Sequence, residues 1–221
     1  MSANQRSKGI QAALASALLL GIVPVFGKQA ILDGFSPLAV VSLRTSIAVF
    51  LLFISMLVYK RQFFYIFPVG LYGCILAGFI NGLGSILYYT ALSRINASIG
   101  QLIYSFYPLF VALWLLLDRQ SINRLTIFRL ALSIPGIVLL LAASENGVDI
   151  LGAILMLGSA ILYALHLIIN QRVLFEVPAP TVTFYTLASM AATVILAFIL
   201  FNPSLPPPQT RWWPIAGMGI L

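Results

Sequence analysis

Arg44 lies inside an almost unbroken apolar run, FSPLAVVSLRTSIAVFLLF, from Phe35 to Phe53. It follows Pro37 by seven residues, which is about 10 Å along a helix. An arginine near the centre of a membrane helix costs about 2.5–3.5 kcal/mol on insertion scales, and intramembrane charges usually mark functional pathways. A planar guanidinium facing a cavity can hold a carboxylate or phosphate through two parallel hydrogen bonds. We therefore predict an anion-recognising or gating role for Arg44. The alternative is that it snorkels outward to loop carbonyls.

Polar side chains recur at helical spacing in other apolar segments, and we predict that they line a cavity. The predicted lining residues, besides Arg44, are Asn81, Ser85, Tyr88, Gln101, Tyr104, Ser159, Tyr163, His166 and Asn170. The last four follow the spacing i, i+4, i+7 and i+11, which places them on a single helix face. The alternative is that such groups hydrogen-bond neighbouring helices, at about 0.6 kcal/mol each. His166 would titrate near neutrality, yet a lone histidine in a bundle is more often a packing residue.

Three prolines, Pro24, Pro108 and Pro135, lie inside apolar segments. Each removes one helix hydrogen bond and frees the carbonyl four residues earlier. Freed carbonyls and the accompanying kink could serve a substrate or a hinge, although kinked packing without function is at least as common. We predict that these prolines are hinge or kink positions.

The elements that must position these residues are membrane helices. The 221 residues are 61% hydrophobic and 8% charged, with a mean hydropathy of +1.05, whereas soluble domains carry about 25% charged residues. A membrane-crossing helix needs about 20 mainly apolar residues, and lipid-exposed backbone must satisfy its own hydrogen bonds. Seven segments qualify, and an eighth opens at Trp212. They are Gly9–Ile31, Pro37–Tyr59, Pro68–Leu92, Ala97–Leu117, Leu125–Ala143, Ile150–Asn170 and Thr181–Phe201.

The net charge of +7 comes from scattered residues, so it indicates topology rather than nucleic-acid binding. With the N-terminus inside, the cytoplasmic face holds seven cations, against three on the other face. The seven are Arg6, Lys8, Lys60, Arg61, Arg119, Arg124 and Arg172, and the three are Lys28, Arg94 and Arg211. This excess predicts a cytoplasmic N-terminus in a plasma membrane, most simply a bacterial inner membrane. The single Cys74 excludes disulfides within the chain and cysteine metal sites.

A gapless offset of 143 residues aligns the start of the chain with a later segment. It pairs Gly9 with Gly152, Ser16 with Ser159, Ala17 with Ala160, Asp33 with Glu176 and Pro37 with Pro180. The offset spans five predicted helices, and because five is odd, the second copy must enter from the opposite face. The expected units are residues 1–143 and 150–221, arranged as an inverted repeat. Two complete copies need about 286 residues, so we expect the helices of a ten-helix protein to continue after Leu221.

The same segments resemble the EamA-type transporters of the drug/metabolite transporter superfamily. SPLAVVSLRTSIA resembles the family pattern P-x5-6-R-x3-A, and LYYTALSRINASIGQLIYSFYPLFVALWLLLD resembles the stretch that ends in an acidic residue, here Asp118. TIFRLALSIPGIVLLL resembles the fifth helix of the family, and the segment from Gly152 resembles the start of a second unit. The resemblance implies a ten-helix permease, often an exporter, with a central cavity between two five-helix halves.

From these features we expect a secondary transporter for a small metabolite or drug-like solute, working by alternating access in the lipid bilayer without a cofactor, a metal or nucleic acid. A homodimer is left open. The acidic residues lie at segment ends and loops, and no H-E-x-x-H or D-x-x-D occurs, so an integral membrane enzyme is disfavoured. A receptor-like or scaffolding membrane protein is the remaining alternative.

Overall fold

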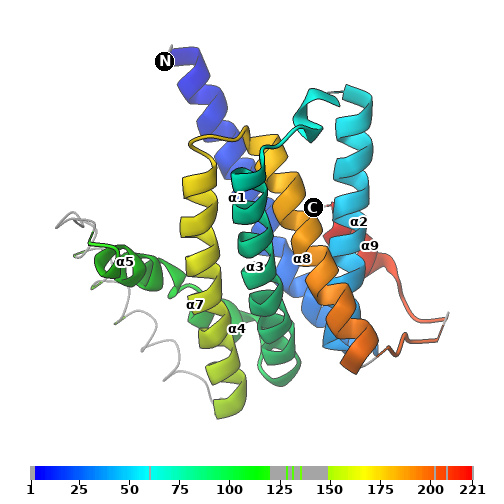
Figure 1. Ribbon diagram of the computed structural model, residues 1–221. Helices are drawn as coiled ribbons and strands as arrows, with labels where there is room; N and C mark the ends of the chain where they lie inside the picture. Colours follow the sequence, from blue (N-terminus) through cyan, green and yellow to red (C-terminus); the bar gives the residue numbers. More distant parts are fainter. Residues whose placement is uncertain are drawn as a thin grey trace.

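The computed structural model describes residues 3–59, 61–119, 149–201, 203–207 and 209–220, together with the isolated positions 128, 131 and 135. These residues form helices and no strand, which confirms the all-helical class (Figure 1). In chain order they are α1 (Ala3–Leu32), α2 (Pro37–Tyr59), the 3-10 turn η1 (Arg61–Phe64), α3 (Pro68–Arg94), α4 (Ala97–Tyr104), α5 (Tyr107–Leu117), α7 (Ile150–Val173), α8 (Ala179–Phe201) and α9 (Trp213–Ile220).

Six segments of this described part are long and apolar enough to cross a membrane. They are Gly9–Leu32, Pro37–Tyr59, Pro68–Arg94, Ala97–Leu117, Ile150–Val173 and Ala179–Phe201. The predicted span Leu125–Ala143 lies outside the described residues apart from the three isolated positions, and α9 has only eight residues. The structure therefore supports six spans of the seven predicted.

The starts of three helices, α3, α5 and α7, have a local cause. Proline occupies one of the first two helical positions of α3 and of α5, where its missing N–H costs no helix hydrogen bond. Asp149 precedes α7, and its side chain accepts hydrogen bonds from the backbone N–H groups of Leu151 and Gly152, as an N-cap residue does.

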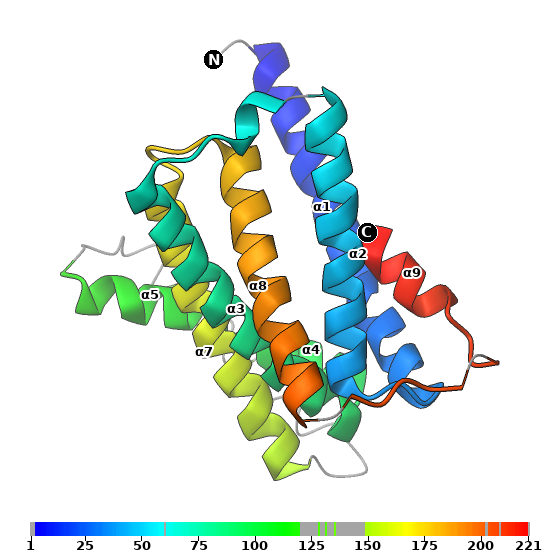
Figure 2. The ribbon, with the colours of Figure 1, turned by 45° about the vertical axis from the view of Figure 1, so that its right-hand side comes forward.

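The predicted span Ala97–Leu117 is not one continuous helix. Helix α4 ends at Tyr104 and α5 begins at Tyr107, and α5 turns steeply away from the axis of α7 (Figures 1 and 2). Pro108 has no N–H to donate to the Tyr104 carbonyl, which is the bond that a continuous helix would need there. The kink predicted at Pro108 is thus a helix break just before it. Pro24, by contrast, lies within α1, which continues through it.

Helix α3 lies between α7 and α8 (Figure 1), and small residues let these helices approach closely. A Cβ atom added at Gly78 would lie 2.3 Å from the Thr186 carbonyl oxygen of α8, and one at Gly73 would lie 2.5 Å from Val173 Cγ2 of α7. Hydroxyl groups add bonds across the same interface, since Ser189 Oγ donates to the Ile75 carbonyl at 2.8 Å. A Cβ at Gly82 would likewise lie 2.9 Å from Thr193 Cβ of α8, so Gly78 and Gly82 both serve the close packing of α3 and α8.

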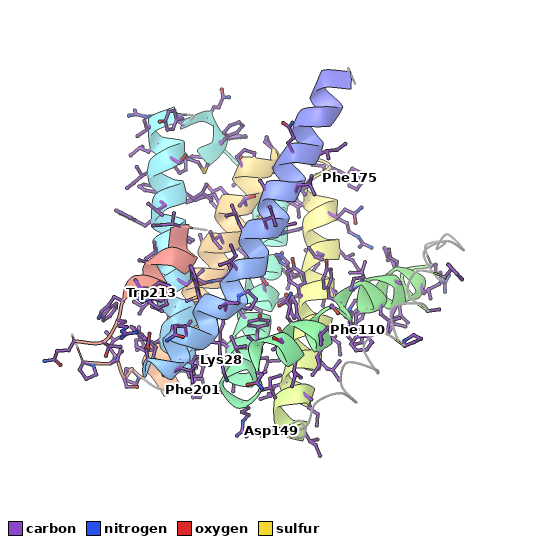
Figure 3. The ribbon with its side chains drawn as sticks, turned by 180° about the vertical axis from the view of Figure 1, so that it is seen from behind. Lys28, Phe110, Asp149, Phe175, Phe201 and Trp213 are labelled. Carbon is purple, nitrogen blue, oxygen red and sulfur yellow. The ribbon has the colours of Figure 1, made fainter. Side chains whose placement is uncertain are left out.

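Helices α1 and α7 run in opposite directions, because α1 begins at the end of the bundle where α7 finishes (Figure 1). Seen from behind, Phe175 lies at one end, and Lys28, Asp149 and Phe201 lie at the other (Figure 3). Opposite directions are what an inverted repeat requires. The unit boundaries, residues 1–143 and 150–221, stay a prediction.

Candidate functional site

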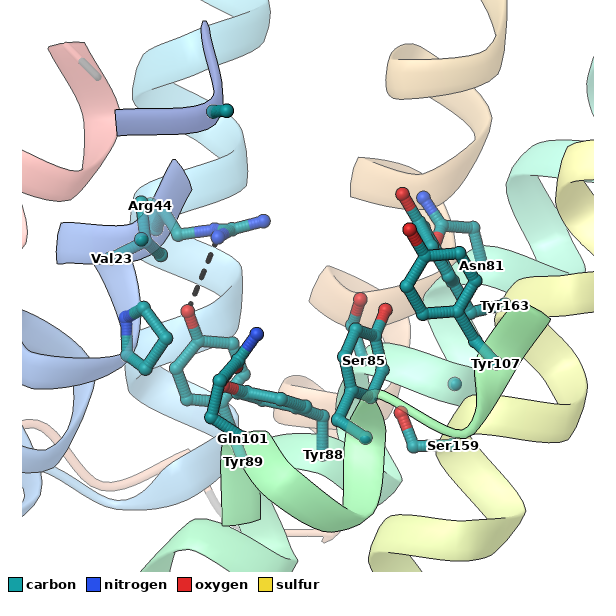
Figure 4. Close-up of a pocket in the computed structure, with 15 residues that line it drawn as sticks. Val23, Arg44, Asn81, Ser85, Tyr88, Tyr89, Gln101, Tyr107, Ser159 and Tyr163 are labelled. Carbon is teal, nitrogen blue, oxygen red and sulfur yellow. Dashed lines mark hydrogen bonds between the residues drawn. The ribbon is translucent and has the colours of Figure 1, made fainter. Parts of the chain in front are cut away.

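A cavity of about 400 Å³ lies inside the helix bundle. Its walls come from α1, α2, α3, α4, α5 and α7 (Figure 4). The lining residues are Ala17, Gly21, Val23, Pro24, Arg44, Asn81, Gly84, Ser85, Tyr88, Tyr89, Gln101, Tyr104, Tyr107, Ser159 and Tyr163. Gly84 lets α3 pack closely against α7 beside the cavity, because a Cβ there would lie 3.3 Å from Leu162 Cβ.

Arg44 supplies the cationic group of the cavity. Its Nη1 donates a hydrogen bond to the Tyr89 hydroxyl at 3.2 Å, and its Cζ lies 5.7 Å from the centroid of the same ring. Within the described part of the chain, the ion pairs are Arg94 with Asp149, at 3.1 Å, and Arg172 with Asp118. Arg44 therefore has no carboxylate partner among these residues. Its hydrogen bond goes to a tyrosine of the bundle interior and not to a loop carbonyl, and its role in a pathway stays a prediction.

Tyrosines from four helices form a continuous aromatic wall. Tyr88 of α3 lies 5.1 Å from Tyr104 of α4, centroid to centroid, and Tyr104 lies 5.3 Å from Tyr163 of α7 and 5.9 Å from Tyr107 of α5. The Tyr88 and Tyr104 rings meet edge to face, the arrangement that the ring quadrupole favours. Tyr88 also donates its hydroxyl to Gln101 Oε1 at 3.3 Å. The wall consequently combines ring surface with polar edges.

The structure brings most of the residues singled out from the sequence to this cavity. Eight predicted lining residues and one predicted kink residue line it: Arg44, Asn81, Ser85, Tyr88, Gln101, Tyr104, Ser159, Tyr163 and Pro24. Pro108 lies at the adjacent helix break. Pro135 is one of the isolated described positions, so the part of the chain around it is not described. The binding roles of all these residues stay predictions.

His166 and Asn170 are not among the lining residues. His166 is 7% exposed, its Nδ1 lies 3.0 Å from the Ala77 carbonyl oxygen, and its Nε2 lies 3.4 Å from Asn170 Nδ2. A carbonyl only accepts, so Nδ1 donates and Nε2 accepts. Asn170 Oδ1 accepts from Thr186 Oγ1 at 3.1 Å, which joins α3, α7 and α8. The stripe from Ser159 to Asn170 is about 16 Å long, so its far half extends past the cavity into helix packing.

The helical spacing of polar residues did not predict two polar lining residues, Tyr89 and Tyr107. Tyr89 follows Tyr88 directly and so lies about 100° around α3 from the predicted polar face. Tyr107 follows the break between α4 and α5, so the periodicity of Gln101 and Tyr104 does not extend to it. The signal that could have found both is composition, because the paired tyrosines of LYYTAL and the SFYP motif flank the predicted polar faces.

The described residues contain no group of three or more His, Cys, Asp or Glu side chains able to hold a metal ion. Arg44 is the one charged residue among those that line the cavity. The chemistry that the arrangement offers is therefore hydrogen bonding, ring stacking and attraction of negative charge.

Comparison with known protein families identifies the family of this chain. Residues 7–142 match the model of the EamA-like transporter family. The chain belongs to this family. As an EamA-like protein with six membrane-crossing segments in its described part, it is a multi-pass membrane protein of a transporter family, not of an enzyme family. The receptor-like or scaffolding alternative is not favoured. The match ends before α7, so the second predicted unit lies outside it.

A solved structure described only as "Crystal structure of protein" has the same fold, with a TM-score of 0.63. The two sequences are 21% identical, and the similarity covers 93% of this chain and 74% of the other. At this identity the likeness concerns the fold of the EamA-like protein alone. No curated protein matches the chain.

Proposed function

We propose that this EamA-like protein is a secondary transporter that moves a small organic solute across the plasma membrane by alternating access. The observation that carries the proposal is a cavity between candidate membrane spans that holds an arginine with no carboxylate partner among the described residues. Polar and charged groups inside a membrane protein are costly, and they face bundle interiors or wet cavities on substrate pathways. A volume of about 400 Å³ lies at the low end of the range of about 300–1,000 Å³ for small-molecule sites.

In this mechanism Arg44 binds the solute and the surrounding helices move about it. Two five-helix halves rock around a central site, which opens to one side of the membrane and then to the other. The break between α4 and α5 lies beside the tyrosine wall and is one place where the backbone can take up such a change. The N-terminus is cytoplasmic in this proposal, and export is the direction that the family resemblance favours.

Reconstitution into proteoliposomes tests the proposal. Vesicles containing the full-length protein are screened with a panel of labelled metabolites, and flux is compared with that of protein-free vesicles. For any solute moved, Arg44→Gln should lower flux about tenfold or more at equal protein abundance, because a hydrogen bond to a charged group contributes about 1.5–3 kcal/mol. Arg44→Lys should restore part of that flux, because it keeps the charge without the bidentate geometry.

The matched control is Arg61→Gln. Arg61 is exposed in η1, and its Nε donates to the Leu57 carbonyl at 3.1 Å, away from the cavity. It should leave flux unchanged. Full flux in Arg44→Ala at normal abundance would show that Arg44 does not bind the solute, and no flux of any solute would refute the transport proposal.

A further inference from the structure

The chemistry of the cavity narrows the class of solute, an inference that rests on the transport proposal above. Arg44 contributes one positive charge, and no carboxylate is among the lining residues. A guanidinium has five N–H donors, and among the described residues the hydrogen bond of Arg44 goes to the hydroxyl of Tyr89. Arg44 is partly buried, and a partly buried charge without an opposite charge beside it loses part of its hydration free energy. A solute with a single negative charge offsets that loss, and a planar carboxylate matches two of the unused donors.

The tyrosine wall adds a second requirement, namely a flat ring. Neighbouring rings of Tyr88, Tyr104 and Tyr163 lie 5.1 and 5.3 Å apart, centroid to centroid. Aromatic pairs at separations of about 4.5–7 Å gain free energy beyond that of area burial. An aromatic ring of the solute that lies against this wall can form another such pair with the tyrosines. A saturated ring fills similar space without that gain.

The far end of the cavity supplies unused hydrogen-bonding groups. The hydroxyls of Tyr104, Tyr107 and Tyr163 make no hydrogen bond to another described residue. Tyr107 and Tyr163 lie with Asn81 on the side of the cavity opposite Arg44 (Figure 4). A solute that extends from Arg44 to this side can form hydrogen bonds there through a polar group at the end remote from its carboxylate.

We propose that the site takes an aromatic monocarboxylate with a hydrogen-bonding substituent on the far side of its ring. The carboxylate lies on Arg44, the ring lies along Tyr88 and Tyr104, and the substituent meets Asn81, Tyr107 and Tyr163. Tyrosine clusters also bind quaternary ammonium groups through their ring faces. Here the Arg44 charge repels such a cation, and no lining carboxylate offsets the repulsion.

Binding to the purified full-length protein in nanodiscs, measured by calorimetry, tests the proposal with matched probes. 4-Hydroxybenzoate should bind about tenfold or more tightly than 4-hydroxybenzamide, which keeps the ring and loses the charge. It should bind about three- to tenfold more tightly than 4-hydroxycyclohexanecarboxylate, which keeps the charge and loses the aromatic ring. Arg44→Gln should abolish the preference for the acid over the amide, whereas Arg61→Gln should preserve it.

Each alternative outcome has a definite meaning. Equal binding of acid and amide, equal binding of the aromatic and saturated acids, tighter binding of choline (a quaternary ammonium cation without a carboxylate), or no binding of 4-hydroxybenzoate would overturn the proposed solute class. If vesicles move other solutes while 4-hydroxybenzoate does not bind, the class is wrong and transport stands. If 4-hydroxybenzoate binds as expected and nothing crosses the vesicle membrane, the class stands and the transport proposal is wrong.

Discussion

At the scale of single residues, polar groups at the ends of the helices hold neighbouring elements together. Lys28 of α1 donates from Nζ to the carbonyl oxygens of Leu92 and Ile95, at 2.7 and 3.0 Å. Leu92 lies in the last turn of α3 and Ile95 is its C-cap residue. The Lys28 cation therefore also lies at the negative end of the helix dipole. The sequence indicates a topological cation at position 28, and the structure adds that it ties α1 to α3.

Asp149 leads to a pH prediction outside the membrane spans. The backbone N–H of Gly152, followed by the Arg94 side chain, lowers the pKa of the Asp149 carboxyl from its usual value. Because the pKa is lower in the folded state, the ionised carboxylate stabilises the fold at pH values above the unfolded-state pKa of about 4. This stabilisation is lost as the pH falls through the pKa of the folded state. We therefore expect the unfolding temperature to decrease when the pH is lowered below about 4. The decrease should be smaller in Asp149→Asn than in the wild type.

Thermal unfolding in detergent between pH 7 and pH 2.5 measures this difference. At pH 7, Asp149→Ala should unfold at a lower temperature than Asp149→Asn, because asparagine still provides an N-cap oxygen. Glu176→Gln is the control, because Glu176 is exposed and has no ion pair among the described residues. An identical acid response in Asp149→Asn and the wild type would contradict the prediction.

At the scale of elements, the contact of α3 with α8 depends on glycine. The carbonyl oxygen of Thr186 would lie 2.3 Å and Ser189 Cβ 2.6 Å from a methyl group at position 78, and a backbone carbonyl cannot move aside alone. Gly78→Ala should therefore separate the helices and destabilise the protein by about 1–3 kcal/mol.

Unfolding of the purified protein in detergent, compared across glycine variants, measures that cost. Gly9→Ala is the matched control, because a Cβ at Gly9 meets no atom within 4 Å and alanine favours the helix by about 1 kcal/mol. It should be neutral or stabilising. If Gly78→Ala were as stable as Gly9→Ala, the close approach of α3 and α8 would be wrong.

At the scale of the whole molecule, the orientation in the membrane can be tested by labelling. The turn η1 and the link between α3 and α4 lie at opposite ends of α3 (Figure 1), and Gln62 and Asn96 are exposed there. In a Cys74→Ala background, Gln62→Cys should react with an impermeant maleimide only from the cytoplasmic side, and Asn96→Cys only from the opposite side.

Phe175→Cys adds the second unit to this experiment. Phe175 is 81% exposed and lies at the end of the bundle remote from Asp149 (Figure 3), so it should label from the same side as Gln62→Cys. Labelling of Gln62→Cys and Asn96→Cys from one compartment would contradict the arrangement of the spans. Labelling of Phe175→Cys with Asn96→Cys would contradict the inverted repeat.

The sequence by itself determined the membrane class, the family and most helix limits. Helix α2 runs from Pro37 to Tyr59 as predicted, and α3 extends its predicted span by only two residues, to Arg94. Long apolar runs bounded by proline and charge leave lipid-exposed backbone one solution, the helix. The helical period also placed Asn81, Ser85 and Tyr88 on one face.

The tertiary structure decided where along each helix that face meets the cavity. It separated Ser159 and Tyr163, which line the cavity, from His166 and Asn170, which bond to neighbouring helices. It also broke the fourth span before Pro108, brought Tyr89 and Tyr107 into the lining of the cavity, and joined Lys28 to α3. The physical reason is that the helical period of a sequence fixes only the directions in which side chains point around the axis of one helix. The depth, tilt and partners of that axis depend on how separate helices pack against one another.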